Sequence, residues 1–243
     1  MLNPETWLLP AVVFLVGVLL VALYFWLALT EYSFLGSRFV RLSYDLMARW
    51  YEGKWKQPEY ESPEQTQRLF MQPILSVAAE DPRSHVLDFA CGTGRISLAL
   101  LACPQFQGRI TAYDFSGGML ARFREHLAEL PEEAATRVEI VQQDLNEWKC
   151  DEPGSCQAAT LLEAAELIKG FPALVGEISH ALTPDGVFLT TRVGARFQWL
   201  FRGRGQSEAD LRRLLEDNGF DRIEIHPWRN RYDVVVARKQ AEI

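Results

Sequence analysis

The stretch HVLDFACGTGR, residues 85–95, indicates the fold more strongly than any other part of the chain. Its first half is rich in β-forming and apolar residues, and its second half places Gly92 and Gly94 in a tight turn before the helical run RISLALLA at 95–102. A buried strand that ends in a glycine turn and leads into a helix is typical of a βαβ unit. Because glycine has no Cβ, the backbone there can turn sharply and approach a ligand closely.

Strands and helices alternate along the chain around this stretch. The predicted strands cover residues 85–90, 109–114, 137–144, 157–162, 186–193, 221–228 and 231–239. The predicted helices of this part cover residues 65–79, 95–102, 117–130, 171–182 and 207–220. Strands that alternate with helices of about 10–15 residues form parallel βαβ units. We therefore expect an α/β fold with a doubly wound, mostly parallel seven-stranded sheet.

The N-terminal residues have a different character, since residues 6–30 contain no charged side chain and residues 7–29 are almost wholly apolar. About 20 apolar residues in a helix are enough to cross the hydrocarbon core of a bilayer. A cleaved signal peptide would have a basic start, a shorter apolar run and a small-residue cleavage site. Because this segment has a long run, no basic start and a poor cleavage site, we expect residues 1–30 to be an uncleaved transmembrane anchor rather than a cleaved signal.

Positive charge predicts the orientation of this anchor. No Lys or Arg precedes the apolar run, whereas Arg38, Arg41 and Arg49 follow it. Cytoplasmic flanks of membrane spans carry an excess of Lys and Arg. The sequence therefore predicts a single-pass membrane protein whose C-terminal domain is cytoplasmic.

Charge and cysteine content exclude other classes of protein. The 243 residues contain 25 Lys and Arg against 32 Asp and Glu, a net charge of -7. This balance argues against a nucleic-acid binder that relies on a global positive field. Four cysteines are too few for a disulfide scaffold, and Cys150 and Cys156, in a predicted loop, lack the further ligands of a metal site. We expect free thiols, no bound metal and no nucleic-acid partner.

Three acidic residues stand at the ends of the first three predicted strands. They are Asp88, Asp114 and Asp144. In a doubly wound sheet, ligands bind at the carboxyl ends of the strands. Asp88 could receive an ammonium group, Asp114 could accept hydrogen bonds from ribose hydroxyls, and Asp144 could accept one from an adenine amino group. The dinucleotide pattern GxGxxG is not met, because Arg-Ile-Ser follow Gly94.

This arrangement resembles the class I S-adenosylmethionine-dependent methyltransferases over about residues 40–239. The resemblance rests on VLDFACGTGR, AYDFSGGML, QQDLNEW and LTPDGVFLTTR, with Ala90 in place of the first glycine of the family's usual DxGxGxG motif. It implies a Rossmann-like methyltransferase fold and S-adenosyl-L-methionine as the cofactor. A helix over residues 37–56, which carries Tyr44, looks like the family's N-terminal lid. The residues that the resemblance implies for cofactor binding are Asp88, Ala90, Gly92, Gly94, Asp114, Phe115, Met119, Asp144, Leu145 and Tyr51.

The acceptor side of the site has weaker signals. The family places substrate contacts after the fourth strand, where Glu163 is the first polar residue and Glu166 follows it. Either carboxylate could orient an acceptor or take its proton, and either could equally be a solvated acid at a helix start. We take Glu163 as the candidate catalytic residue. The (D/N)PP(Y/F) motif of amine-modifying relatives is absent, which argues against adenine and glutamine amides as acceptors.

Residues 196–204 combine arginine with the aromatic residues Phe197, Trp199 and Phe201. Basic segments with aromatic side chains favour anionic membrane surfaces. We expect this segment to contact a membrane, and a lid or helix cap with solvated arginines is the alternative.

Together these features predict a membrane-anchored methyltransferase. Its acceptor would be small and lipophilic or lipid-like: a quinone, an isoprenoid, a lipid, or a hydrophobic thiol or phenol. Because no convincing base is visible, a non-catalytic S-adenosylmethionine-binding assembly factor at the membrane is the alternative. The expected organisation is an anchor at 1–30, a juxtamembrane and lid-like helix with a connector at 31–64, and the methyltransferase domain at 65–243.

Overall fold

The computed structural model describes residues 5–29, 36–55, 62–201 and 206–241. The chain divides into two compact units, residues 1–43 and 44–243. The first unit contains helix α1 (Glu5–Leu29) and the start of helix α2 (Ser37–Trp55). The division falls inside α2, between the boundaries that the sequence predicts after residues 30 and 64.

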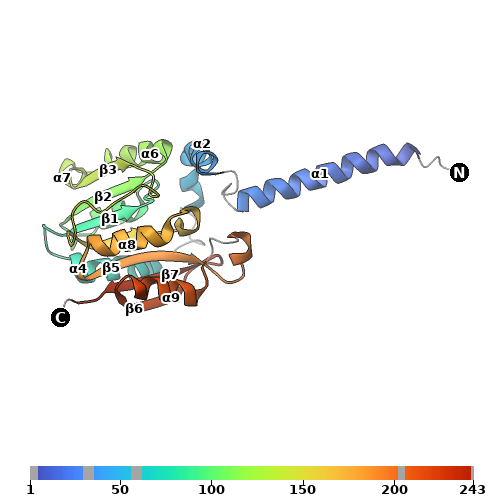
Figure 1. The fold of residues 1–243 in the computed structure, drawn as a ribbon. Coiled ribbons are helices and arrows are strands. Elements are labelled where there is room, and N and C mark those ends of the chain that lie inside the picture. Colours follow the sequence, from blue (N-terminus) through green and yellow to red (C-terminus); the bar gives the residue numbers. More distant parts are fainter. Residues whose placement is uncertain (1–4, 30–35, 56–61, 202–205, 242–243) are drawn as a thin grey trace. The chain divides into compact units, whose positions relative to one another are not determined.

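Helix α1 covers the apolar run in which the sequence predicts a membrane span (Figure 1). Its described side chains are those of residues 10–23 and Trp26. Counting only the described part of the chain, no helix is both long and apolar enough to cross a membrane. The predicted span is not confirmed by this part of the chain.

The second unit is built on one seven-stranded sheet with the strand order β3-β2-β1-β4-β5-β7-β6. The strands are β1 (His85–Phe89), β2 (Arg109–Asp114), β3 (Val138–Gln142), β4 (Cys156–Leu161), β5 (Leu182–Val193), β6 (Phe220–Pro227) and β7 (Tyr232–Lys239). Strands β1 to β5 pair in parallel, and β7 lies antiparallel between β5 and β6. The predicted doubly wound, mostly parallel sheet is confirmed. The strand order reverses between β1 and β4, which is where such a sheet binds its ligand.

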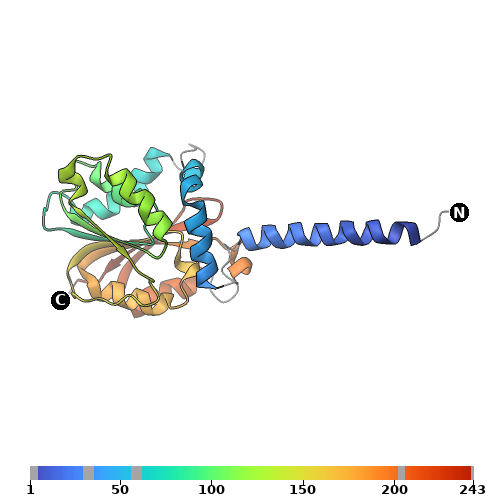
Figure 2. The same cartoon turned by 90° about the horizontal axis from the view of Figure 1, so that it is seen from above.

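Helices cover both faces of the sheet (Figure 2). One face packs against α4 (Gln72–Ala78), α5 (Arg95–Leu101) and α6 (Gly117–Leu127), and the other packs against α8 (Phe171–Ala181) and α9 (Glu208–Asp217). Successive residues of a strand point to opposite faces, so Val86 belongs to the first apolar core and Leu87 to the second. Both faces of β1 are therefore covered, and all five of its residues are buried.

Several local features differ from the prediction. The single helix expected at 65–79 is interrupted, because a π-helical turn (Gln67–Met71) lies between α3 (Pro63–Thr66) and α4. Strand β5 begins at Leu182, four residues before the predicted start. Cys156 is the buried first residue of β4 and not a loop thiol, although all four cysteines are free.

Short helices complete the described part of the chain. They are α7 (Glu132–Ala135), a 3₁₀ turn at Ala165–Leu167 and another at Gln198–Phe201. Ser207 caps α9, because its side chain accepts a hydrogen bond from the Asp210 N–H.

Candidate functional site

The turn after β1 has a backbone conformation that favours glycine. Ala90, Gly92 and Gly94 have φ values of +50°, +57° and +86°. At Gly94 a Cβ would lie 2.2 Å from the ring of Phe123, so packing as well as backbone geometry requires glycine there. At Ala90 the left-handed conformation costs about 1–2 kcal/mol. The fold therefore holds this turn in one strained shape at the carboxyl end of β1.

Asp88 connects the turn to two neighbouring elements. Its carboxylate accepts hydrogen bonds from Ser97 Oγ on α5 and Thr160 Oγ1 on β4, each at 2.6 Å. Burial raises the pKa of the Asp88 carboxyl, and the two hydroxyl bonds oppose that rise. These contacts give Asp88 a positioning role in the turn, and its direct contact with an ammonium group stays a prediction.

Asp114, at the end of β2, joins two loops at the same edge of the sheet. Its Oδ2 accepts the N–H of Gly92 at 2.9 Å, and its Oδ1 accepts the N–H of Ser116 at 2.8 Å. Burial raises the pKa of the Asp114 carboxyl to about 6, although these backbone bonds lower it. Each carboxylate oxygen can accept a second hydrogen bond. Asp114 can therefore keep both loops in place and still accept hydroxyl groups of a ribose.

Helix α2 contributes polar and aromatic groups from the second compact unit. Asp45 Oδ1 accepts hydrogen bonds from Ser116 Oγ at 2.6 Å and from the Gly118 N–H at 2.9 Å. The ring of Tyr44 lies edge-on to Phe115, with centroids 6.4 Å apart, and 6.1 Å from the ring of Tyr51. Sequence reasoning identified both tyrosines as lid residues but missed Asp45, because an acid in a polar helix gives no signal of its own.

The remaining predicted cofactor residues lie towards β2 and β3. Met119 and Leu145 are buried, and Asp144 Oδ1 accepts hydrogen bonds from the backbone and side-chain amides of Asn146 at 2.9 Å and 2.7 Å. A contact of Asp144 with an adenine amino group stays a prediction.

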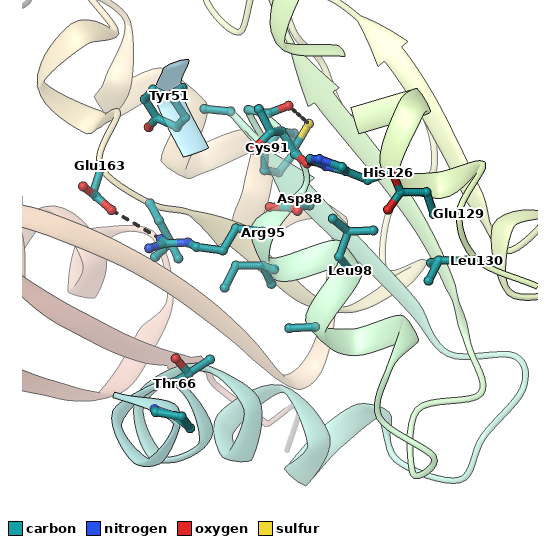
Figure 3. A pocket seen from close by; sticks show the side chains of 18 residues that line it. Tyr51, Thr66, Asp88, Cys91, Arg95, Leu98, His126, Glu129, Leu130 and Glu163 are labelled. Carbon is teal, nitrogen blue, oxygen red and sulfur yellow. Dashed lines mark hydrogen bonds and ion pairs between the residues drawn. The ribbon is translucent and has the colours of Figure 1, made fainter. Parts of the chain in front are cut away.

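A cavity of about 680 Å³ opens beside the turn (Figure 3). Asp88, Ala90 and Gly92 line one part of it, and Tyr51 of α2 also borders it. Much of its wall is apolar, with Phe89, Ile96, Leu98, Ala99, Leu130 and Leu162. The cavity therefore brings apolar surface next to the predicted cofactor residues.

Glu163, the candidate catalytic residue, lies at this cavity between two arginines. Arg95 Nη2 is 3.3 Å from Glu163 Oε1, and Arg229 Nη1 is 3.0 Å and 3.1 Å from the two carboxylate oxygens. The Glu163 backbone has φ +56°, and its N–H donates to Thr191 Oγ1. Protonation of Glu163 would remove the charge that both guanidinium groups bind. This geometry favours a positioning role, and catalysis by Glu163 stays a prediction.

The structure also places Glu166 and the segment 196–204. Glu166 is buried and accepts a hydrogen bond from the hydroxyl of Tyr232, so it is not a solvated acid. In the segment 196–204, Phe201 is buried beneath Arg231 whereas Trp199 is exposed. Phe201 therefore packs in the protein, the contact of this segment with a membrane stays a prediction, and residues 202–204 lie outside the described residues.

Comparisons with known proteins give the same picture of the domain. Residues 86–186 match the family model of a methyltransferase domain. The comparison with curated proteins finds no match.

Solved structures share the fold at low sequence identity. The [4+2]-cyclase SpnF is 17% identical with a TM-score of 0.65, over 85% of this chain and 97% of that one. The geranyl diphosphate C-methyltransferase of Streptomyces coelicolor is 17% identical with a TM-score of 0.57, over 72% and 79%. The phosphoethanolamine N-methyltransferase 2 of Haemonchus contortus is 16% identical with a TM-score of 0.56, over 71% and 52%. The chain thus spans about half the length of the Haemonchus protein.

Proposed function

We propose that this chain, whose residues 86–186 are a methyltransferase domain with S-adenosyl-L-methionine as its cofactor, transfers the cofactor's methyl group to a small lipophilic or lipid-like acceptor. The observation that supports this proposal best is the link between Asp114 and the N–H of Gly92. It joins the turn after β1 to the end of β2 at the switch point of the sheet, beside the 680 Å³ cavity.

The residues of the turn fit the cofactor in chemical type. Gly92 brings bare backbone to the cavity edge, and Asp114 offers acceptor atoms for ribose hydroxyls. Asp88 holds the turn through Ser97 and Thr160. When bound, the cofactor supplies an electrophilic methyl group on a sulfonium. The task of the protein is then to orient the acceptor and to exclude water.

The cavity wall supports a lipophilic acceptor. Leu98, Leu130 and Leu162 line it together with the ring of Phe89, and apolar surface binds apolar groups of a ligand. A base is required only if the acceptor atom must lose a proton. The ion pairs of Glu163 are therefore compatible with transfer to an acceptor atom that has no proton to lose.

A non-catalytic S-adenosylmethionine-binding protein is the second candidate. The observation that favours it is the position of Glu163 between Arg95 and Arg229, where proton transfer would break two ion pairs. SpnF, which shares the fold, is named a cyclase, so the fold by itself does not require methyl transfer.

We also propose that α1 anchors the protein in a membrane with the methyltransferase domain on the cytoplasmic side. The side chains from Val12 to Val16 and from Val18 to Val21 are apolar and exposed. Exposed apolar side chains on every side of a helix are stabilised by lipid rather than by water. Resistance of the full chain to extraction by alkaline carbonate would support the anchor, and complete release would contradict it.

The proposed reaction is tested with the full-length protein, methyl-labelled S-adenosylmethionine and a lipid extract. We expect S-adenosylhomocysteine and a labelled lipophilic product, and we expect both to fall strongly in Asp114→Ala. Cofactor binding without any product above the no-extract control would favour the non-catalytic alternative. Failure to bind the cofactor would contradict both candidates.

A further inference from the structure

We propose that the outer face of α2 binds the surface of an anionic bilayer, as a membrane contact separate from α1. This inference goes beyond the proposed anchor, because it concerns the helix that borders the site. It comes from four large apolar side chains of α2, which we call the outer stripe: Phe39, Leu42, Leu46 and Trp50.

The inner face of α2 is packed in the methyltransferase domain. Ala48 is buried, the ring of Tyr44 lies edge-on to another ring of the domain, and Tyr51 borders the cavity. Ala48 stands two residues from both Leu46 and Trp50, which is about 200° around an α-helix. Leu46 and Trp50 therefore point away from the face that holds the helix on the domain.

The outer stripe is exposed although its side chains are large and apolar. Leu46 and Trp50, which belong to the second compact unit, are 65% and 76% exposed. Phe39 and Leu42, which belong to the first unit, are 54% and 53% exposed. Their spacing of three or four residues along α2 is that of one side of a helix. An exposed apolar stripe of this kind marks a surface that contacts another molecule or a membrane.

Basic residues accompany the outer stripe. Arg38, Arg41 and Arg49 of α2 are exposed. By sequence α2 contains four basic residues and two acidic ones, in a chain whose net charge is -7. Of the two acids, Asp45 accepts hydrogen bonds from the start of α6, and the side chain of Glu52 lies outside the described residues. The exposed charges among the described side chains of α2 are therefore all positive.

This combination is typical of a helix that lies in a membrane interface. Such helices place Trp, Phe and Leu on the lipid side with basic residues beside them, and they bind anionic lipids. Tryptophan is enriched at the depth of the head groups. Because Tyr51 of the same helix borders the cavity, docking of the outer stripe places the cavity one helix diameter, about 10 Å, from the lipid. A lipophilic acceptor is dissolved there.

A second copy of this chain fits the outer stripe less well. A fully exposed aromatic side chain offers about 150–250 Å², so four side chains that are half to three-quarters exposed offer roughly 500 Å². A stable dimer buries about 800 Å² on each partner. A symmetric contact would also bring the arginines of two copies together. An anionic bilayer covers the same apolar side chains and attracts the arginines.

The inference is tested by photolabelling of the full chain in vesicles of phosphatidylcholine and phosphatidylglycerol. A trace of phospholipid carries a diazirine near the glycerol end of one acyl chain. Light expels dinitrogen, and the carbene that remains inserts into the nearest side chain, which peptide mass spectrometry then identifies. We expect label on Leu46 and Trp50, and about 5-fold less on Tyr44 and Ala48 of the inner face.

Three variants test the role of the outer stripe. Leu46→Glu places a charge on it and should lower the labelling of Trp50 about 5-fold. Arg49→Gln should lower this labelling in anionic vesicles by up to about 5-fold and leave it unchanged in pure phosphatidylcholine. Arg83→Gln makes the same change at a residue outside α2 whose side chain is 92% exposed, and it should have no effect in either vesicle.

The outcomes separate this inference from the proposed anchor and from the proposed reaction. Label on α1 without label on the outer stripe would overturn this inference and leave the anchor in place. Absence of label from both helices would contradict both. No methyl transfer is needed for the experiment, so its result does not depend on the reaction.

Measurements in detergent identify the other occupants of the outer stripe. A dimer in analytical ultracentrifugation that Leu46→Glu converts to a monomer would assign the stripe to a second copy. A large fall in melting temperature in Leu46→Glu would assign it to packing against another segment of the chain. Either result would overturn the inference, whereas an unchanged mass and melting temperature agree with a face that lipid covers.

Discussion

The conformation of the turn after β1 depends on single residues, and Gly94 is the most constrained of them. Gly94→Ala adds a Cβ at φ +86° and within 2.2 Å of the buried Phe123 ring. The left-handed backbone costs about 1–2 kcal/mol, and overpacking adds about 1–3 kcal/mol. We expect the free energy of unfolding to fall by about 2–5 kcal/mol in urea titrations, and the affinity for S-adenosylhomocysteine to fall as the turn shifts.

Gly154→Ala is the matched control for this substitution. Gly154 also has a positive φ, +61°, but no atom lies within 4 Å of its added Cβ. Gly154→Ala should lower the free energy of unfolding only by the backbone contribution, about 1–2 kcal/mol. An equal decrease in the free energy of unfolding in both variants would show that the Phe123 ring moves aside without destabilising the protein.

Because the Asp114 carboxyl titrates, we expect both the stability of the fold and the affinity for the cofactor to depend on pH. Burial raises its pKa from 3.8 to about 6 in the folded chain. The folded state therefore favours the protonated form. The stability that this group contributes is fully present below about pH 4 and is lost as the pH rises through about 6. Ribose hydroxyls donate better to the ionised form. Cofactor affinity should thus rise with pH across the same range.

Calorimetry at several pH values tests this expectation. Below pH 6 the affinity of the wild type for S-adenosylhomocysteine should fall by up to about 10-fold per pH unit. Asp114→Asn cannot ionise, so its affinity should be nearly constant from pH 5 to 7 and about 10–100-fold weaker than wild type at pH 7. If the affinity depends on pH equally in the wild type and in Asp114→Asn, another group causes the pH dependence.

At the scale of elements, Asp45 attaches α2 to the first turn of α6. Its carboxylate accepts hydrogen bonds from Ser116 Oγ and the Gly118 N–H. A carboxylate at a helix N-terminus is stabilised by the helix dipole. Asp45→Ala should lower the free energy of unfolding by about 1–3 kcal/mol and increase hydrogen exchange in α2 and in the first turn of α6.

Glu125→Ala provides the comparison for Asp45→Ala. Glu125 is an exposed residue of α6 that pairs with Arg122. Its removal should change stability by less than about 0.5 kcal/mol. Unchanged exchange in Asp45→Ala would mean that α2 is attached by its apolar contacts instead.

The elements also show what a sequence can predict. Strands such as β1 and β2 were predicted well because short runs rich in β-forming residues end in turn signals. The π-helical turn at Gln67–Met71 was missed because its side chains fit an α-helical period equally well. The start of β5 at Leu182 was missed because Pro184 and Gly186 read as a turn.

The candidate site could be predicted in part for a similar reason. Gly92 and Gly94 stand in one short motif and Asp114 in another, so the sequence alone indicates that these residues belong to the site. The partners Arg229 and Thr160 come from distant segments, 66 and 72 residues from Glu163 and Asp88. Only the fold brings them together, and no spacing rule in the sequence indicates which arginine meets Glu163.

At the scale of the whole molecule, the proposed anchor belongs to one compact unit and the site to the other. The hydrogen bonds that build the site come from residues 44–243. We therefore expect deletion of residues 1–30 to leave cofactor binding intact. The affinity for S-adenosylhomocysteine should stay within about twofold of the full chain, and the truncated protein should no longer fractionate with membranes.

Turnover should respond differently from binding in the truncated protein. An anchor confines the site to the bilayer surface and so raises the effective concentration of a lipophilic acceptor without any new contact. Methyl transfer to an acceptor embedded in vesicles should therefore fall, and dispersing that acceptor in detergent should restore part of it. Equal turnover of the embedded acceptor by both proteins would contradict the proposed anchor. If the truncated protein aggregates or melts far below the full chain in detergent, residues 1–30 contribute to the folded domain itself, because an independent anchor would leave its stability unchanged.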